Sequence, residues 1–303
     1  MSEITRGQLM TELLSTEGQY LDELPLEAAL ERLHRADLQA AESVRAAHGE
    51  VAEAVKLIRA RIADGGRVFY LGAGTSGRLA TLDAAELPPT FGVPETLFQA
   101  IIAGGADALT RAVEGAEDQG HAAASALLQR KLCPKDVVLG IAAGGTTPFV
   151  HGGLAYAQEI GAATIFMACV PKNQVADSYD LSIRLLSGPE EVQGSTRMKA
   201  GTATKLCLNA ISTMVWVGLG KVHRGRMVDV STQANQKLID RGERLVMDLG
   251  QVERSKSQDL LRASAGQVKP AVVMARLDVD CPTATRLLQA HDGHLGACLE
   301  QGR

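Results

Sequence analysis

Aromatic residues are scarce in this sequence, at 3% of its 303 residues. Proteins that bind single-stranded nucleic acid stack the bases on aromatic side chains, so this platform is largely missing. Basic charge is also in short supply, with 31 Lys and Arg against 35 Asp and Glu and a net charge of −4. A general nucleic-acid binder needs a basic footprint, whereas a small anionic substrate needs only a locally positive pocket. The composition therefore argues against a nucleic-acid partner and leaves an anionic small molecule open.

Paired cysteines and long apolar runs are missing as well. The five cysteines form no CxxC pair and no metal-ligand spacing, which favours free thiols in a reducing cytosol. The most apolar stretch, residues 206–219, is interrupted by polar side chains and is too short to span a bilayer. No basic segment leading into an apolar core opens the sequence, so we expect no secretory signal. The sequence predicts a cytoplasmic protein that does not associate with membranes.

The apolar pattern changes its period near residue 64. Apolar residues recur at helical spacing from residue 26 to residue 62, and Asp64-Gly65-Gly66 then ends the pattern. Short, continuous apolar runs alternate with helical stretches beyond this point. The runs are residues 67–71, 97–102, 136–141, 163–168 and 181–186. Such runs are typical of strands covered on both faces, and their alternation with helices predicts a doubly wound, five-stranded parallel sheet.

Only helical patterns remain from about residue 233 onward, and they are broken at Gly266 and Pro282. We therefore predict three regions in an α/β protein. They are an N-terminal helical arm (1–48), a sheet domain (49–230) and a small C-terminal helical bundle (231–303).

A glycine-rich segment directly follows the first predicted strand. Gly72-Ala-Gly74-Thr-Ser-Gly77-Arg78 matches the G-x-G-x-x-G pattern of dinucleotide-binding loops. That fingerprint also needs an acidic residue at the tip of the second strand, and Ile101-Ile-Ala-Gly-Gly105 supplies none. Thr75 and Ser76 instead offer two hydroxyls at a helix N-terminus, which suits a single phosphate. We favour a sugar-phosphate loop over a dinucleotide loop, and a strand–helix turn that binds nothing is the remaining alternative.

Two later segments repeat this chemistry. Ala142-Ala-Gly-Gly145-Thr-Thr-Pro148 follows the third strand, and there a threonine can cap a helix that has the proline in its first turn. Gly194-Ser-Thr-Arg-Met-Lys199 follows the fifth strand and leads into a long helix. Each alone is more often a helix cap than a site, but loops at the carboxyl ends of parallel strands converge on one crevice. The predicted phosphosugar-binding residues are Gly74, Thr75, Ser76, Gly77, Arg78, Gly145, Thr146, Thr147, Ser195, Thr196 and Lys199.

Two glutamates are placed where helix ends would push their pKa values apart. Glu86 precedes Pro88 and Pro89, which we expect to end the helix, so the negative end of the helix dipole and partial burial would favour the protonated carboxyl. Gly115 would end one helix, and Glu117 or Asp118 would begin the next, whose positive end favours the Glu117 carboxylate. Such a pair suits a general acid, Glu86, and a general base, Glu117. On the residues alone, two helix caps or solvated surface acids explain the pattern about equally well.

Five segments together resemble the N-acetylmuramic acid 6-phosphate etherases, members of the sugar isomerase (SIS) domain superfamily. The segments are LGAGTSGRLATLDAAELPPTFGV (71–93), IAGGADALTRAVEGAED (102–118), GIAAGGTTPFV (140–150), GSTRMKAGTATKLCLNAIST (194–213) and GKVHRGRMVDV (220–230). The resemblance implies a homodimer that releases D-lactate from N-acetylmuramic acid 6-phosphate by elimination and hydration, giving N-acetylglucosamine 6-phosphate without a metal or an organic cofactor. It places the family's acid at Glu86 and its second catalytic glutamate at Glu117. The sequence departs from the family at Gly144, where a serine is common.

Two other functions share parts of this pattern. A phosphosugar-binding regulator would need the loops without the glutamates, and an aldose–ketose isomerase also begins with proton abstraction at C2. The two glutamate motifs favour the etherase over both. Ser76 and Glu86 lie ten residues apart on one predicted helix, roughly 15 Å, which exceeds the span of a sugar phosphate from its phosphate to C3. Either another loop holds the phosphate near Glu86, or Glu86 serves the neighbouring subunit of the dimer.

Overall fold

The computed structural model describes residues 6–15, 18–230, 232 and 236–301 and divides into two compact units. The first unit comprises Met1–Ala85 and Thr96–Ser212, and the second comprises Glu86–Glu95 and Thr213–Arg303. The first five residues, where no secretory signal is expected, and the predicted domain boundary at residue 231 lie outside the described residues.

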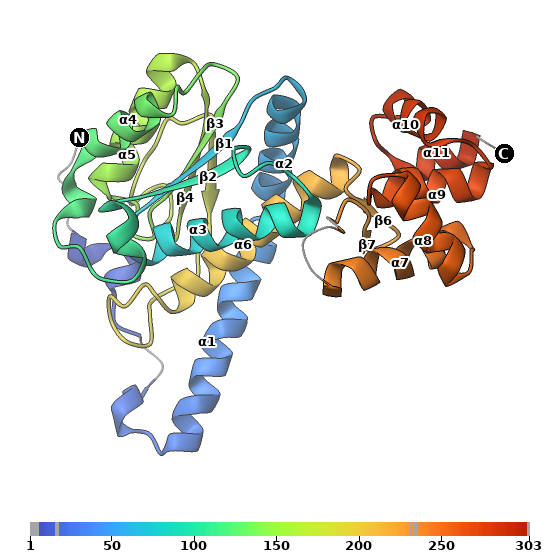
Figure 1. The fold of residues 1–303 in the computed structure, drawn as a ribbon. Coiled ribbons are helices and arrows are strands. Elements are labelled where there is room, and N and C mark those ends of the chain that lie inside the picture. Colours follow the sequence, from blue (N-terminus) through green and yellow to red (C-terminus); the bar gives the residue numbers. More distant parts are fainter. Residues whose placement is uncertain (1–5, 16–17, 231, 233–235, 302–303) are drawn as a thin grey trace. The chain divides into compact units, whose positions relative to one another are not determined.

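The first unit is built on one parallel sheet (Figure 1). The strand order is β2-β1-β3-β4-β5. Val68 of β1 pairs with Phe98 of β2 on one side and with Val137 of β3 on the other. β1, β3 and β4 are buried along their whole length, as their continuous apolar runs predict. The predicted five-stranded parallel sheet is thereby confirmed. The strands are β1 (Val68–Gly72), β2 (Phe98–Ile102), β3 (Val137–Ile141), β4 (Ala163–Ala168) and β5 (Leu181–Arg184).

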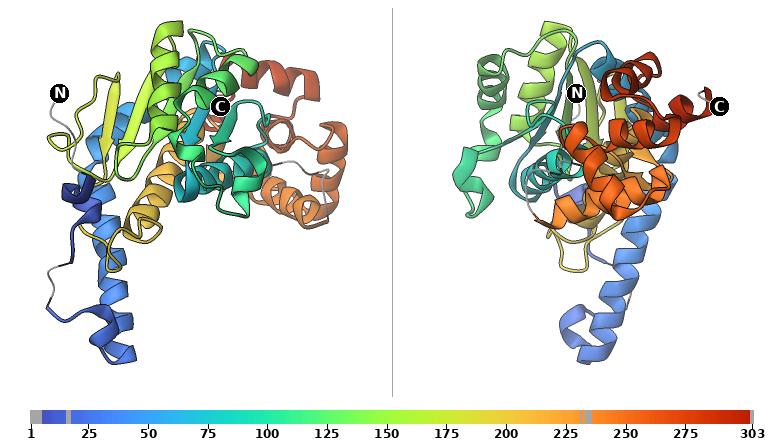
Figure 2. Two further views of the ribbon diagram at one scale, coloured as in Figure 1. Left: turned by 90° about the vertical axis from the view of Figure 1, so that its left-hand side faces the viewer. Right: turned by 45° about the vertical axis from the view of Figure 1, so that its right-hand side comes forward.

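Helices cover both faces of this sheet (Figure 2). α4 (Gly120–Gln129) and α5 (Pro148–Ile160) share a core with Phe69 and Leu71 of β1. Tyr70 lies between those two residues and points to the opposite face, because side chains alternate along a strand. There its hydroxyl contacts Asp83 (3.2 Å) on α3 (Gly74–Phe91), which also accepts a hydrogen bond from Asn209 (2.8 Å) on α6 (Lys199–Gly218). The sheet is therefore doubly wound.

The N-terminal region is helical but not continuous. The predicted helical stretch forms α1 (Leu26–Ala46) and α2 (His48–Ala63), which are separated at Ala47. Three single turns precede them: η1 (Arg6–Gln8), η2 (Met10–Glu12) and η3 (Leu21–Glu23). Arg32 of α1 is buried and pairs with Glu191, and it also donates to Ser15 (2.9 Å), so α1 is fastened to the segment before it and to the loop before α6.

The helix after the first glycine loop does not end at Glu86, so that prediction is wrong. α3 continues through Pro88 and Pro89 to Phe91. The prolines have no amide hydrogen to donate to the carbonyls one turn earlier. Phe91 is nonetheless buried against Trp216, with ring centroids 6.2 Å apart. The packing of the final turn outweighs the local preference of the two prolines.

The second unit has a core of its own and is mainly helical. Val246, Leu249, Val272 and Leu288 lie at its centre. Gly266 adopts a positive φ of 78° between two of the helices, as the predicted break requires. Its elements are β6 (Val222–His223), β7 (Arg226–Met227), α7 (Gln236–Gly250), α8 (Arg254–Ala263), α9 (Val268–Leu277), α10 (Cys281–Ala290) and α11 (Leu295–Gln301). None of the helices in the described ranges combines the length and apolar character that crossing a membrane requires.

Candidate functional site

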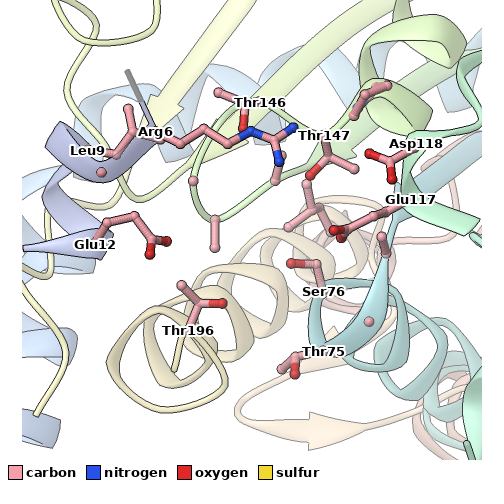
Figure 3. A pocket seen from close by; sticks show the side chains of 18 residues that line it. Arg6, Leu9, Glu12, Thr75, Ser76, Glu117, Asp118, Thr146, Thr147 and Thr196 are labelled. Carbon is pink, nitrogen blue, oxygen red and sulfur yellow. The ribbon is translucent and has the colours of Figure 1, made fainter. Parts of the chain in front are cut away.

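A pocket of about 410 Å³ lies in the first unit at the carboxyl ends of the strands (Figure 3). Residues from all three predicted loops line it: 73–76 after β1, 142–144 and 146–148 after β3, and Thr196 before α6, together with Ile141 at the end of β3. Glu117, Asp118 and parts of the segment Arg6–Glu12 complete the lining. The volume is typical of small-molecule sites. The crevice predicted at the carboxyl ends of the strands is thus a cavity that three separate loops form together.

Two helices begin at this pocket. α3 starts at Gly74 and α5 at Pro148, and both positions line the cavity. The first four amides of a helix have no intrahelical acceptor, and the helix dipole makes this end positive. Thr147 precedes Pro148 as predicted, but its side chain makes no capping hydrogen bond. Its hydroxyl therefore remains available to a ligand, and the two helix starts suit an anion.

The N-terminus of α6 is occupied differently. Glu190 is almost fully buried, and its carboxylate accepts hydrogen bonds from the amides of Lys199 (2.8 Å) and Ala200 (3.0 Å). Burial raises the pKa of Glu190, and these amide hydrogen bonds oppose the rise. A carboxylate of the protein thus already fills the place that an anionic ligand would take at this helix.

Hydroxyl side chains line much of the cavity. Within the described chain none of these side chains hydrogen-bonds another residue. They are Thr75, Ser76, Thr146, Thr147 and Thr196. In the same ranges, no group of three or more His, Cys, Asp or Glu side chains is arranged to hold a metal ion. The lining therefore offers free hydroxyls, amides and carboxylates, which can bind an anion and transfer protons.

Two of the predicted binding glycines shape the loops. Gly145 has a φ of +78°, and a Cβ there would come within 3.0 Å of Val170. The Nε2 atom of His151 lies 2.7 Å from the carbonyl oxygen of Gly145 and fixes the loop from behind. A Cβ on Gly77 would meet Ile102 at 2.5 Å, so this glycine allows α3 to pack closely on β2.

Three other predicted residues have partners outside the described pocket lining. Arg78 donates to the carbonyls of Leu109 (3.2 Å) and Arg111 (2.9 Å) and so holds the loop that leads to Glu117. Lys199 is buried and donates from Nζ to Gln39 on α1 (2.7 Å). The amide of Ser195 donates to the Val192 carbonyl (2.9 Å) in the turn before α6.

Glu117 lies in the short helix η5 (Ala116–Asp118), just before α4. Gly115 precedes this turn with a φ of +71°, and it does not end a helix as predicted. Ala116 is buried and anchors the turn, whereas the Glu117 side chain is exposed and points towards Ser76 (Figure 3). A carboxylate thus projects into the hydroxyl-lined pocket from a loop that is fastened on both sides.

Glu86 belongs to the second unit, where it lies in the last part of α3. Its side chain is exposed, so the predicted partial burial is wrong. The neighbouring Leu87 is buried, and Thr90 donates to the Glu86 carbonyl (2.7 Å). Because α3 extends to Phe91, Glu86 also lies more than a turn before the negative end of the helix. Its role as the acid remains a prediction from the family resemblance.

Arg6, Glu12 and Asp118 are not among the residues predicted from the sequence. All three line the pocket. Asp118 adjoins a predicted residue and could have been included on spacing. Arg6 and Glu12 stand in single turns far from the sheet in sequence, and no periodic pattern marks them. Only the folded chain brings this segment to the loops.

The fold and the loops define the class of protein, a doubly wound α/β protein with a five-stranded parallel sheet. A sequence model of the glucokinase regulatory protein N-terminal SIS domain matches residues 50–158. A phosphoheptose isomerase from Francisella tularensis, 16% identical, superposes with a TM-score of 0.48 over 63% of this chain and 98% of its own.

Closer relatives cover nearly the whole chain. The N-acetylmuramic acid 6-phosphate etherase of Gloeothece citriformis is 48% identical over 97% of this chain and 96% of its own length. The protein of the same name from a Nostoc species is 50% identical over 96% of this chain and 94% of its own length. The chain belongs to the N-acetylmuramic acid 6-phosphate etherase family.

Proposed function

We propose that this chain is a carbon–oxygen lyase that converts N-acetylmuramic acid 6-phosphate and water into N-acetylglucosamine 6-phosphate and D-lactate. Identity of 48% to an etherase over 97% of the chain supports the reaction. The observation that carries the proposal is the position of Glu117, a carboxylate beside unpartnered hydroxyls and two helix N-termini. This arrangement combines a proton acceptor with an anion cradle.

The elimination requires two proton transfers, and the hydration that follows reverses both. In the open-chain aldehyde, the carbonyl acidifies the hydrogen on C2, and the Glu117 carboxylate removes it. The C3–O bond then breaks as Glu86 protonates the departing ether oxygen, which leaves a C2=C3 double bond. Water then adds across this bond: Glu86 takes a proton from the water as its oxygen bonds to C3, and Glu117 returns a proton to C2. Each positioned proton transfer contributes about 10²- to 10⁴-fold in rate.

The phosphate anchors the substrate and takes no part in bond breaking. Thr75, Ser76, Thr146, Thr147 and Thr196 donate their hydroxyls to it, together with amides at the starts of α3 and α5. Binding energy from this remote group orients C2 and C3 against the carboxyl groups. Ser195 adjoins one of these donors, and Arg78 supports the Glu117 loop.

The protein acts as a cytoplasmic homodimer. All five cysteines are free, which suits a reducing compartment. α1 carries a row of exposed leucines, and such apolar exposure is typical of a subunit interface. The leucines are Leu26, Leu30 and Leu38, which are 69%, 47% and 69% exposed. We assign residues 1–48 to the helical arm, 49–230 to the phosphosugar domain and 231–303 to the C-terminal region.

Incubation with N-acetylmuramic acid 6-phosphate and an enzymatic assay for D-lactate test the proposal. We expect lactate and N-acetylglucosamine 6-phosphate in equal amounts, with solvent deuterium at C2 when the reaction runs in D₂O. Unphosphorylated N-acetylmuramic acid is the matched control and should react far more slowly. A regulator would bind the phosphosugar without releasing lactate, and an isomerase would interconvert aldose and ketose phosphates. Either result in place of lactate release would refute the etherase proposal.

A further inference from the structure

The N-terminal segment Arg6–Glu12 forms one wall of the pocket although it precedes the sheet by more than fifty residues. The Met10 amide donates to Gln174 (2.9 Å), and Gln174 donates back to the Gln8 carbonyl (3.2 Å). Gln193 donates to the Glu12 carbonyl (2.8 Å). Leu9 packs into the core of the sheet unit and Thr11 is fully buried. The segment is therefore fastened in place from both sides.

This segment supplies the pocket with positive charge. Arg6 is the one cationic side chain among the described lining residues, whereas Glu12, Glu117 and Asp118 are acidic. A phosphate dianion beside three carboxylates needs an opposing charge nearby. In Figure 3 the Arg6 side chain extends from the N-terminal segment in the direction of Thr146 and Thr147, which line the same pocket. No other described residue forms an ion pair with Arg6, which lines the cavity and is exposed.

The loop after β3 offers no side-chain hydrogen-bond donor at its two glycines, Gly144 and Gly145, where it meets the N-terminal segment. The nearest atoms to a Cβ on Gly144 would be Thr11 Oγ1 (3.7 Å) and Leu9 Cδ1 (3.9 Å). The N-terminal segment thus stands directly against the loop, and its arginine lines the same pocket as the two threonines that follow the glycines. A guanidinium binds phosphate oxygens through two parallel hydrogen bonds, which suits this position.

We propose that Arg6 binds the 6-phosphate together with Thr146 and Thr147, so that the N-terminal segment is part of the substrate site. This inference rests on the proposed function. Arg6 would bind the phosphate equally in the ground state and in the transition state. Its loss should therefore raise KM and leave kcat nearly unchanged.

The test compares Arg6→Ala and Arg6→Lys with Arg35→Ala, a matched change at an exposed arginine on α1. For Arg6→Ala we expect KM for N-acetylmuramic acid 6-phosphate to rise about 10- to 100-fold, the range for a hydrogen bond between charged groups. The inhibition constant of N-acetylglucosamine 6-phosphate should rise by the same factor. The KM and the inhibition constant of Arg6→Lys should lie between those of the wild type and Arg6→Ala, because lysine keeps the charge but cannot form two parallel hydrogen bonds. Arg35→Ala should match the wild type, and thermal unfolding should show that all variants fold.

The substrate carries a second anion, the lactyl carboxylate, and the product lacks it. If Arg6→Ala raised KM for the substrate but left product inhibition unchanged, Arg6 would hold the carboxylate and the proposal would be wrong. Unchanged values for both ligands would also overturn it. If the wild type released no lactate, the proposed function would fail independently. Titration of N-acetylglucosamine 6-phosphate against wild type and Arg6→Ala would still decide whether Arg6 binds the phosphate.

Discussion

The strand ends form two edges of the central sheet, one where β1 and β3 begin and one where they end. Polar side chains at these two edges differ in whether they form hydrogen bonds within the protein. Where β1 and β3 begin, Asp136 is fully buried, and it accepts hydrogen bonds from the Arg67 amide (2.8 Å), the Arg67 guanidinium (2.7 Å) and the Cys133 amide (2.9 Å). Arg67 also donates to the carbonyls of Arg130 (3.0 Å) and Lys131 (2.8 Å). Where the same strands end, the pocket hydroxyls have no partner in the described chain. One edge stabilises the fold, and the other keeps its donors free for a ligand.

The electrostatics follow the same division. Burial raises the pKa of Asp136, but the hydrogen bonds from Arg67 and the Cys133 amide outweigh it, so the net pKa is below the ordinary 3.8. The hydrogen bond to Asp136 in turn raises the pKa of Arg67. Glu117, at the opposite edge, is exposed and has no cation paired with it in the described chain. The comparison predicts that changes at one edge affect stability and changes at the other affect activity.

The largest effect should come from Glu117→Gln. We expect lactate release to fall at least about 100-fold, because the amide cannot accept the C2 proton. Urea unfolding should show an unchanged stability, since the side chain is exposed. Asp118→Asn is the matched control in the same turn and should lose less than about tenfold. Activity near the wild-type level in Glu117→Gln would remove this residue from the mechanism.

Glu86→Gln tests the predicted acid in the second unit. A loss of about 100-fold or more is expected here too, because the leaving oxygen would depart unprotonated. If the active site is shared, mixing Glu86→Gln with a Thr146→Ala/Thr147→Ala double variant should restore part of the activity in heterodimers. Heterodimers that form but stay inactive would place both sets of residues in one subunit.

Asp136→Asn should have the opposite effect to Glu117→Gln: it should lower stability and leave activity unchanged. The Asp136 carboxylate is fully buried but its partner Arg67 is 27% exposed, so leaving the donors of Arg67 and Cys133 without this acceptor should lower the free energy of unfolding by about 1–3 kcal/mol. The folded fraction should keep its kcat/KM. Asp64→Asn is the control, because Asp64 pairs with Lys135 at 3.5 Å with both side chains exposed, and it should change stability by less than about 0.5 kcal/mol. Loss of kcat/KM at full stability in Asp136→Asn would contradict the division between the edges.

The lowered pKa of Asp136 also predicts a pH dependence. Asp136 stabilises the fold above the ordinary pKa of 3.8, and this stabilisation is lost as the pH falls through its lower folded value. The wild type should therefore lose stability more steeply than Asp136→Asn below about pH 4. Urea unfolding of both proteins between pH 3 and pH 7 measures the difference. Parallel curves across this range would show that the carboxylate has no lowered pKa.

Ser76→Asp should weaken substrate binding by about 10- to 100-fold, because it sets a carboxylate against the phosphate dianion. Ser76→Ala removes one hydroxyl only and should raise KM a few fold. The inhibition constant of N-acetylglucosamine 6-phosphate separates this effect from catalysis. Equal affinity of wild type and Ser76→Asp for that product would show that the first loop does not hold the phosphate.

The sheet and the convergence of its loops could be predicted because both follow from local signals. A continuous apolar run such as 163–168 marks a buried strand, and parallel strands deliver their carboxyl ends to one edge. Thr147 and Pro148 likewise predicted the start of α5. These features depend on near neighbours in the sequence.

The predictions from the sequence were wrong or incomplete where contacts between residues far apart in the chain determine the structure. Nothing near Pro88 reveals that Phe91 packs on Trp216 and extends α3 past two prolines. The sequence shows that Lys199 is basic, but not that Gln39 takes its ammonium group. Arg6 reaches the pocket only because Gln174 and Gln193 fasten its segment. In each case the determining partner lies more than a hundred residues away.

The smallest predicted effect is at Gly144, where the family commonly has a serine. The φ of Gly144 is not positive, and a Cβ would meet nothing closer than 3.7 Å, so Gly144→Ser should fold normally. The new hydroxyl can bond the phosphate, which should lower KM about two- to fivefold. It can instead bond Thr11 Oγ1, which is buried without a partner in the described chain, and should then raise stability by about 0.5–1 kcal/mol. Kinetics and urea unfolding distinguish the two, and Thr11→Val in the same background abolishes only the second.

Gly145→Ser is the contrasting control: its φ of +78° and its contacts with Val170 and Val175 predict a loss of about 1–3 kcal/mol. Equal damage from both serines would show that the loop cannot accept a side chain at either position.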